Sequence, residues 1–177
     1  MASIVRWRKS DLQQGMSAMS AHELAQMNVA RLRAPLDSPE LADFVGALDR
    51  INAVADRADG FVWRLQDESG NATALHPMGE DIIVNMSVWR DPQALQAFVY
   101  RSDHVGVMRR RREWFEKMDL FMVLWWVPSG HRPTVAEAMA RLDLLRDQGP
   151  GANAFTFGKL FPAPTAADAV PTSAIAG

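Results

Sequence analysis

The stretch Asp81-Ile-Ile-Val-Asn-Met-Ser-Val-Trp89 decides the fold, because its side chains alternate between two kinds. Successive residues of a β-strand point to opposite faces of the sheet. One face of this strand is purely apolar and consists of Ile82, Val84, Met86 and Val88. The other face mixes apolar, polar and aromatic residues, namely Ile83, Asn85, Ser87 and Trp89. We therefore expect a strand whose faces meet different surroundings, such as a second sheet and a lined cavity.

The rest of the chain supplies helices and further strands around this one. Strand patterns cover residues 23–33, 61–66, 120–127 and 154–157. Helices are expected to start at Ser38-Pro39 and Asp91-Pro92, where a capping residue precedes a proline. A capping box, Thr134-Val-Ala-Glu137, opens a further helix. The order β-α-β-β-α-β, followed by this helix and a short strand, predicts an α+β fold of the ferredoxin-like split βαβ type. Such a fold has an antiparallel sheet with helices on one face.

A sheet with helices on one face leaves its other face bare in a monomer. The apolar row that begins at Ile82 indicates that this face is covered. The simplest cover is a second copy of the chain, with the two sheets facing each other. We therefore predict a homodimer in the form of a dimeric α/β barrel.

Length and composition fit one domain of ordinary size. The chain has 177 residues, which we divide into a flexible N-terminal arm (1–21), a compact domain (22–161) and a disordered tail (162–177). There are no cysteines, so disulfides and thiolate sites are excluded, and the net charge of −2 gives no case for nucleic acid. No apolar run reaches a membrane span or a signal peptide, so we expect a cytoplasmic protein without membrane contact.

A second helical stretch, residues 98–115, carries polar groups on its apolar side. At 3.6 residues per turn, the stripe that faces the sheet includes Tyr100, His104, Arg111 and Trp114. Of the four consecutive arginines, only Arg111 lies squarely among apolar residues. An unpaired buried charge is costly. Arg111 therefore needs either an acid, such as Asp49 or Asp119, or a ligand.

The mixed sheet face and the helices over it are expected to enclose a pocket. The predicted substrate-binding residues are Asn28, Asn52, Trp63, Asn85, Ser87, Trp89, Tyr100, Trp114 and Trp126. Gln26 shares the face of Asn28, and either Trp125 or Trp126 must point inward because neighbouring strand residues alternate. Apolar walls with a few convergent polar groups are typical of a small-molecule site. Alternatively, the six tryptophans fill a core, and Asn28, Asn85 and Ser87 form a hydrogen-bond network inside it.

Two residues are candidates for catalysis. His104 suits proton transfer, because the unperturbed pKa of histidine lies near working pH. A structural role or a place at a helix start is the competing interpretation of His104. Arg111 could hold a carboxylate, phenolate or enolate oxyanion. No pair among the four histidines has metal-ligand spacing, so no metal site is expected.

Several blocks of the sequence together resemble one known family. They are Ala25–Arg31, Leu48–Asn52, Gly60–Arg64, Asn85–Trp89, Arg109–Phe115, Leu124–Pro128 and Ala154–Phe157. In this order they resemble the bacterial domain-of-unknown-function family 3291, over residues 22–162. That family is placed in the dimeric α/β-barrel superfamily, alongside the antibiotic-biosynthesis monooxygenases. The resemblance implies a dimer and a pocket between each sheet and its own helices. It implies no particular reaction, because the superfamily holds cofactor-free oxygenases, haem enzymes, isomerases and proteins without known chemistry.

The leading hypothesis is a small-molecule enzyme with a Trp-lined pocket for an aromatic or polycyclic substrate. It would act without a cofactor, as a monooxygenase or an isomerase, since both reactions need a stabilised carbanion or enolate in a dry pocket. One alternative is a haem-binding protein with His104 as the axial ligand. The other is a small-molecule-binding protein without catalysis.

Overall fold

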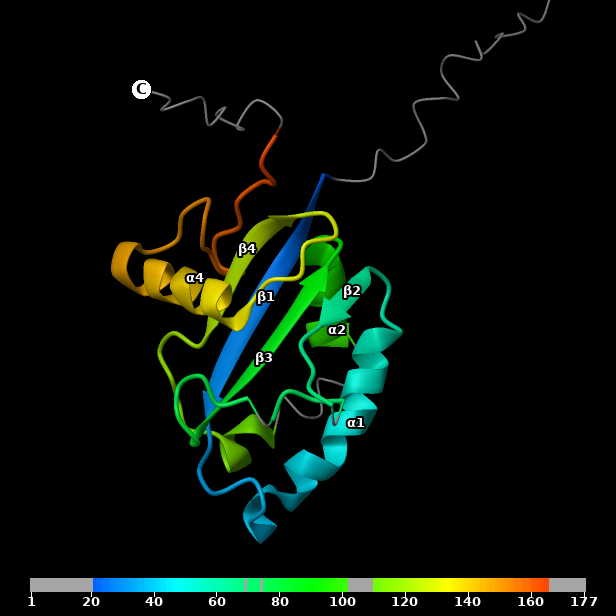
Figure 1. The fold of residues 1–177 in the computed structure, drawn as a ribbon, viewed down its shortest axis with the longest axis vertical. Helices are drawn as coiled ribbons and strands as arrows, with labels where there is room; N and C mark the ends of the chain where they lie inside the picture. The colour runs from blue at the N-terminus through cyan, green and yellow to red at the C-terminus, as the bar shows by residue number, and fades with distance from the viewer. Residues whose placement is uncertain (1–20, 69, 74, 102–109, 166–177) are drawn as a thin grey trace, which may run out of the picture.

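The computed structural model describes residues 21–68, 70–73, 75–101 and 110–165 (Figure 1). Its elements in chain order are β1 (His22–Arg31), η1 (Pro39–Leu41), α1 (Ala42–Asp56), β2 (Phe61–Arg64), β3 (Ile82–Trp89), α2 (Pro92–Arg101), β4 (Met122–Pro128) and α4 (Val135–Gln148). The strands form a four-stranded sheet in the order β2-β3-β1-β4, and every neighbouring pair is antiparallel. The predicted α+β fold with a ferredoxin-like antiparallel sheet is confirmed. β3 and β1 are the two central strands.

Two of the three predicted helix starts form the expected caps. Asp91 accepts a hydrogen bond from the Ala94 amide at 2.8 Å, and Thr134 accepts one from the Glu137 amide at 3.1 Å. Ser38 is in the extended conformation of an N-cap, but its hydroxyl makes no capping bond. The helical segment after Ser38 begins with the short 3-10 helix η1. Its turn is tighter than that of an α-helix, so its first amides lie in different positions relative to the Ser38 hydroxyl.

The edge strand β2 contains an irregularity that the sequence pattern does not reveal. Phe61 pairs with Trp89, whereas Trp63 pairs with Val88, so the register shifts between them. An extra residue in a strand reverses the alternation of the side chains that follow it. Simple alternation along residues 61–66 would put Phe61 and Trp63 on one face, but the register shift separates them. Trp63 packs against the apolar core on the opposite face.

The apolar face of the sheet is covered within the chain by α4. Met86 and Val88 on this face are 1% and 0% exposed, and α4 buries Ala138, Leu142 and Leu145 against the same cluster. Figure 1 shows α4 crossing in front of β4 and β1, with α2 behind the sheet. The expectation that helices lie on one face and leave the other bare is wrong. This burial removes the argument for a second sheet as cover, and the homodimer stays a prediction.

A polar contact fixes the first turn of α4 to the sheet. The indole N–H of buried Trp125 donates to Glu137 Oε1 at 2.9 Å, and His131 Nε2 lies 2.8 Å from Glu137 Oε2. Burial raises the pKa of Glu137, but the bonds from His131 and Trp125 outweigh it, so the pKa lies below its usual value. Because this carboxyl group has a lower pKa in the folded protein than in the unfolded chain, it stabilises the fold at pH values above the ordinary carboxyl pKa. The stabilisation is lost as the pH falls through the lowered pKa.

The ends of the chain fall largely outside this description. The predicted arm, residues 1–21, is described only at residue 21, and the predicted tail, residues 162–177, only as far as residue 165. Within the described residues, no helix is both long and apolar enough to cross a membrane.

Shortening Leu142 to alanine tests whether α4 is an integral cover of the sheet. Leu142 is 0% exposed, so Leu142→Ala should lower the free energy of unfolding by about 2–5 kcal/mol. Leu160→Ala is the matched control, because Leu160 is 41% exposed and should lose no more than about 0.5 kcal/mol. Urea unfolding followed by tryptophan fluorescence measures both variants. Equal small losses would show that α4 does not pack on the sheet as described.

Candidate small-molecule site

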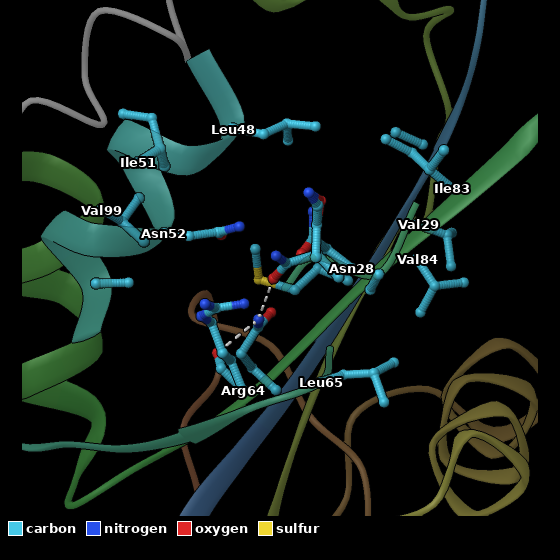
Figure 2. Close-up of a pocket in the computed structure, with 18 of the residues that line it drawn as sticks. Asn28, Val29, Leu48, Ile51, Asn52, Arg64, Leu65, Ile83, Val84 and Val99 are labelled. Carbon is cyan, nitrogen blue, oxygen red and sulfur yellow. Dashed lines mark hydrogen bonds between the residues drawn. The ribbon is translucent and has the colours of Figure 1, made fainter. Parts of the chain in front are cut away.

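A cavity of about 190 Å³ lies between the mixed face of the sheet and the helices α1 and α2. Leu48 and Ile51 of α1 and Val99 of α2 form its helical wall, as Figure 2 shows. For comparison, a dry cavity of roughly 150 Å³ holds a benzene molecule. This space therefore suits an aromatic compound of one or two rings.

The aromatic wall of the cavity surrounds Trp89. Phe98 stacks on the Trp89 ring with centroids 5.1 Å apart, and Phe61 meets the same ring edge-on at 5.4 Å. All three residues line the cavity. Of the four tryptophans predicted to line it, Trp89 is the one that does so. The register shift in β2 brings Phe61 into the place expected for Trp63.

A chain of hydrogen bonds runs across the sheet floor. Gln26 of β1 donates through Nε2 to Ser87 Oγ and to Asn85 Oδ1 of β3, both at 2.9 Å. The indole N–H of Trp89 donates to the same Ser87 oxygen at 2.8 Å. Gln26 and Ser87 are 5% and 7% exposed, so both are core groups that satisfy each other. Ser87 therefore belongs to a hydrogen-bond network inside the core, which was the alternative to a substrate-binding role.

Asn28, Asn52 and Asn85 differ from Gln26 and Ser87, which are buried and bonded to each other. Asn85 is exposed at the end of the chain of bonds, and its carbonyl is engaged by Gln26, which leaves its N–H₂ group free to donate. Asn28 is paired with Asn85 across the strands, and Asn52 reaches toward Asn28 from α1 (Figure 2). All three line the cavity. Their amides converge on a space that a ligand could occupy.

Arg111 lines the cavity without an acid partner in the described part of the chain. Its guanidinium carbon lies 4.6 Å from the centroid of the Phe121 ring. Asp49 and Asp119, the two acids considered from the sequence, do not pair with it. Its neighbour Arg110 differs, because hydrogen bonds to Glu113 and to Asp43 at 2.8 Å raise the pKa of Arg110. Arg111 thus presents a cation to the cavity.

Two residues predicted from the helical stripe, Tyr100 and Trp114, lie elsewhere. Tyr100 is 65% exposed and approaches Phe157, whereas Trp114 is 2% exposed and packs in a cluster with Leu41 and Phe44. α2 is described as far as Arg101 and helical residues 110–114 follow, while residues 102–109 between them lie outside the described residues.

Trp126 lies on the predicted sheet face but beyond the cavity. It pairs with Leu24 at the far end of β1, and its indole N–H donates to the Phe161 carbonyl at 2.9 Å. Trp125 points to the opposite face, as the alternation requires. His104 lies outside the described residues, so its place relative to the cavity stays a prediction.

The lining residues that the sequence pattern missed include Arg64 and Asn71. Arg64 follows the register shift in β2, and Asn71 lies in the loop after it. Arg64 donates through Nε to Asp56 at 2.8 Å and through Nη1 to the Gly70 carbonyl at 2.6 Å. Alternation along β2 places Arg64 away from the cavity unless the shift is known, and no sequence signal marks it. Arg64 is therefore a paired cation, unlike Arg111.

The described residues contain no group of three or more His, Cys, Asp or Glu side chains placed to bind a metal ion.

The model of one family matches residues 23–171 of the chain. The chain belongs to the family described as Domain of unknown function (DUF3291). A comparison with curated proteins finds no match.

Solved structures with a similar arrangement include SnoaB, a cofactor-independent oxygenase from Streptomyces nogalater. It is 20% identical, with a TM-score of 0.40, and the alignment covers 66% of this chain and 100% of SnoaB. PA3566 from Pseudomonas aeruginosa is 14% identical with a TM-score of 0.44, and 67% and 100% of the two chains are covered. A protein of unknown function from Nitrosomonas europaea, NE2512, is 15% identical with a TM-score of 0.40, at 64% and 95% coverage. At these TM-scores the similarity supports no argument about this chain's activity.

Removing the Ser87 hydroxyl tests the hydrogen bonds on the sheet floor. Ser87→Ala leaves the buried donors of Gln26 and Trp89 without their acceptor and should lower the free energy of unfolding by about 1–3 kcal/mol. Ser38→Ala is a matched control, because the buried Ser38 hydroxyl has no partner and its loss should be neutral. Denaturant unfolding compares the two. Equal stability of the two variants would contradict the network.

Proposed function

We propose that this chain is an enzyme that binds a small aromatic or polycyclic compound in the cavity and stabilises an oxyanion on it. The observation that carries the proposal is the guanidinium of Arg111, which lines an apolar cavity without an acid partner among the described residues. The reactions that fit are cofactor-independent monooxygenation and isomerisation.

The surroundings of Arg111 strengthen its effect on a ligand. Arg111 is partly buried at the cavity wall, so its attraction for an anion that binds beside it is screened less than in bulk water. The planar guanidinium can donate two parallel hydrogen bonds to a carboxylate, or one to a phenolate or enolate oxygen. The N–H₂ group of Asn85 adds a neutral donor on the sheet floor. Such preorganised donors stabilise charge that develops during a reaction.

Both reactions begin with the same chemical step. A base removes a proton from a carbon next to a carbonyl group, the electron pair forms a carbon–carbon double bond, and the carbonyl oxygen becomes an enolate. Arg111 would hold that oxygen. In isomerisation the proton returns at another carbon. In monooxygenation the enolate reduces dioxygen: a ring CH₂ carbon becomes a carbonyl that carries one oxygen atom, and its two hydrogens leave with the other oxygen atom as water. We assign the base to His104, which remains a proposal.

The two alternatives make different demands on the chain. Haem binding depends on His104 as the axial ligand, and no observation on the described residues favours it. Binding without catalysis would use the same cavity and the same contact to Arg111. The presence or absence of turnover therefore separates an enzyme from a binding protein.

The common step can be measured directly. The protein should accelerate the exchange of the α-hydrogens of 2-tetralone with deuterated water, followed by NMR, because enolate formation controls this exchange. Arg111→Gln should slow the catalysed exchange by roughly 100-fold, as loss of an oxyanion donor does. Arg112→Gln is the matched control, since Arg112 is exposed and does not line the cavity. Dioxygen uptake with a panel of quinols then distinguishes the two reactions.

Two results would contradict the proposal. If hydrogen exchange and dioxygen uptake are the same with and without the protein, the chain is not an enzyme for these reactions and is at most a binding protein. Equal activity of the Arg111→Gln and Arg112→Gln variants would show that the cavity cation takes no part.

A further inference from the structure

We propose that Asn28 and Asn52 together bind a neutral ligand group in which a hydrogen-bond donor lies beside an acceptor, as in a carboxamide or a hydroxy ketone. The inference rests on the proposed function, because it concerns a second contact of the ligand in the same cavity. It makes the expected substrate an aromatic compound with an anionic oxygen at Arg111 and a neutral donor–acceptor group at the two asparagines.

The side-chain amides of Asn28 and Asn52 are unpaired and open to the cavity. Within the described part of the chain, neither amide has a hydrogen-bond partner. Both residues are half-buried and line the cavity. Their amide nitrogen and oxygen atoms remain accessible to solvent, so a ligand that enters the cavity can reach them. A ligand that pairs with these amides replaces the hydrogen bonds that they otherwise make to water.

The two amides approach the cavity from opposite walls. Asn28 lies on the central strand β1, directly opposite Asn85 of β3, and belongs to the sheet floor. Asn52 lies on α1 and points toward Asn28 (Figure 2). Leu48 and Ile51 line the cavity from the same face of α1, so this face of the helix is turned toward the sheet. A ligand group placed between the two asparagines can therefore bond to both walls.

The chemistry of an asparagine amide defines the group that fits there. The amide presents a carbonyl acceptor next to N–H donors. A carbonyl beside an N–H or O–H complements this edge, which is how asparagine recognises adenine in DNA. Arg111 and the free N–H₂ group of Asn85 can only donate, so they favour acceptors on the ligand. The carbonyls of Asn28 and Asn52 add acceptors that can pair with a ligand's N–H or O–H.

Competition with water makes this contact selective. Water can both donate to and accept from an amide, so the free protein keeps the two asparagines hydrated in solution. A ligand that displaces this water gains affinity only if it reproduces the lost hydrogen bonds. A ligand with an acceptor but no donor leaves an asparagine carbonyl unpaired. The affinity of such a ligand is lower for this reason.

Two neutral ligands of the same shape test the inference. 2-Naphthamide carries a carbonyl beside an N–H₂ group, and 2-acetylnaphthalene has a methyl group in place of this donor. By titration calorimetry, the wild-type protein should bind 2-naphthamide about tenfold more tightly. A double variant with Asn28→Leu and Asn52→Leu keeps the size of both side chains. It should bind 2-acetylnaphthalene at least as tightly as 2-naphthamide, because the ketone is the easier of the two to remove from water.

Single variants and a matched control complete this test. Asn52→Leu changes a half-buried helix position and should by itself lose most of the preference for 2-naphthamide. Asn153→Leu, at an exposed position away from the cavity, should keep the preference of the wild-type protein. Urea unfolding shows whether each variant is folded before its binding is compared.

The ligand 2-naphthoate separates this inference from the proposed function, because its carboxylate tests the anion site. Arg111→Gln should weaken the binding of 2-naphthoate and leave the preference between the two neutral compounds unchanged. The asparagine site would be overturned if the wild-type protein bound both neutral compounds equally or bound neither, even with 2-naphthoate weakened by Arg111→Gln. A preference that persists in the double variant would overturn it as well. Unchanged binding of 2-naphthoate by Arg111→Gln, with an intact preference for 2-naphthamide, would contradict the anion site instead.

The side-chain signals of protein labelled with nitrogen-15 test the contact itself. Addition of 2-naphthamide should shift the N–H₂ signals of Asn28 and Asn52, which are assigned by their loss in the leucine variants. The Asn153 signal should stay in place, because Asn153 lies away from the cavity. Binding that leaves the signals of both cavity asparagines unmoved would show that the compound lies elsewhere, and would overturn the inference.

Discussion

The strict alternation of side chains along β3 is the constraint on which the rest of the structure depends. Met86 and Val88 point into the core under α4, while Asn85 and Ser87 point to the cavity floor. A shift of one residue in the pairing with β1 would exchange these two sets. The apolar set would then line the cavity, and the polar set would be buried under α4. The packing on both faces of β3 therefore fixes the register of its pairing with β1. The same register that buries the apolar side chains under α4 places the polar side chains at the cavity floor.

The predictable part of the molecule is the part governed by local rules. Alternation in β1 and β3 places Asn28, Asn85 and Trp89 at the cavity, and capping chemistry locates the starts of α2 and α4. The role of α4 was not predictable, since its apolar stripe is equally compatible with either face of the sheet. The register shift in β2 depends on pairing with β3, which local propensity does not encode. It moves Trp63 out of the site and brings Arg64 in. Tyr100 and Trp114 were placed at the cavity by helical periodicity alone, and periodicity does not determine which side of a helix packs against which element.

Charge pairing distinguishes the arginines around the cavity. Arg64 and Arg110 have carboxylate partners, so their charges serve to fix a loop and a helical turn. Arg111 has an aromatic ring instead, and this ring holds the cation in place while it leaves the N–H groups available. Together with the amides of β1, β3 and α1, it gives the cavity one charged end and a neutral polar floor. An aromatic ligand with an ionised oxygen complements these groups.

A crystal structure with 6-bromo-2-naphthoate would test this account most directly, because the anomalous signal of bromine locates the ring independently of its interpretation. The account predicts that the ring lies between Trp89 and the wall formed by Leu48 and Ile51, with the carboxylate in hydrogen-bond distance of Arg111. It would be contradicted if the bromine lay outside this cavity. It would equally be contradicted if Arg111 were turned away from the carboxylate and paired with an acid of the chain.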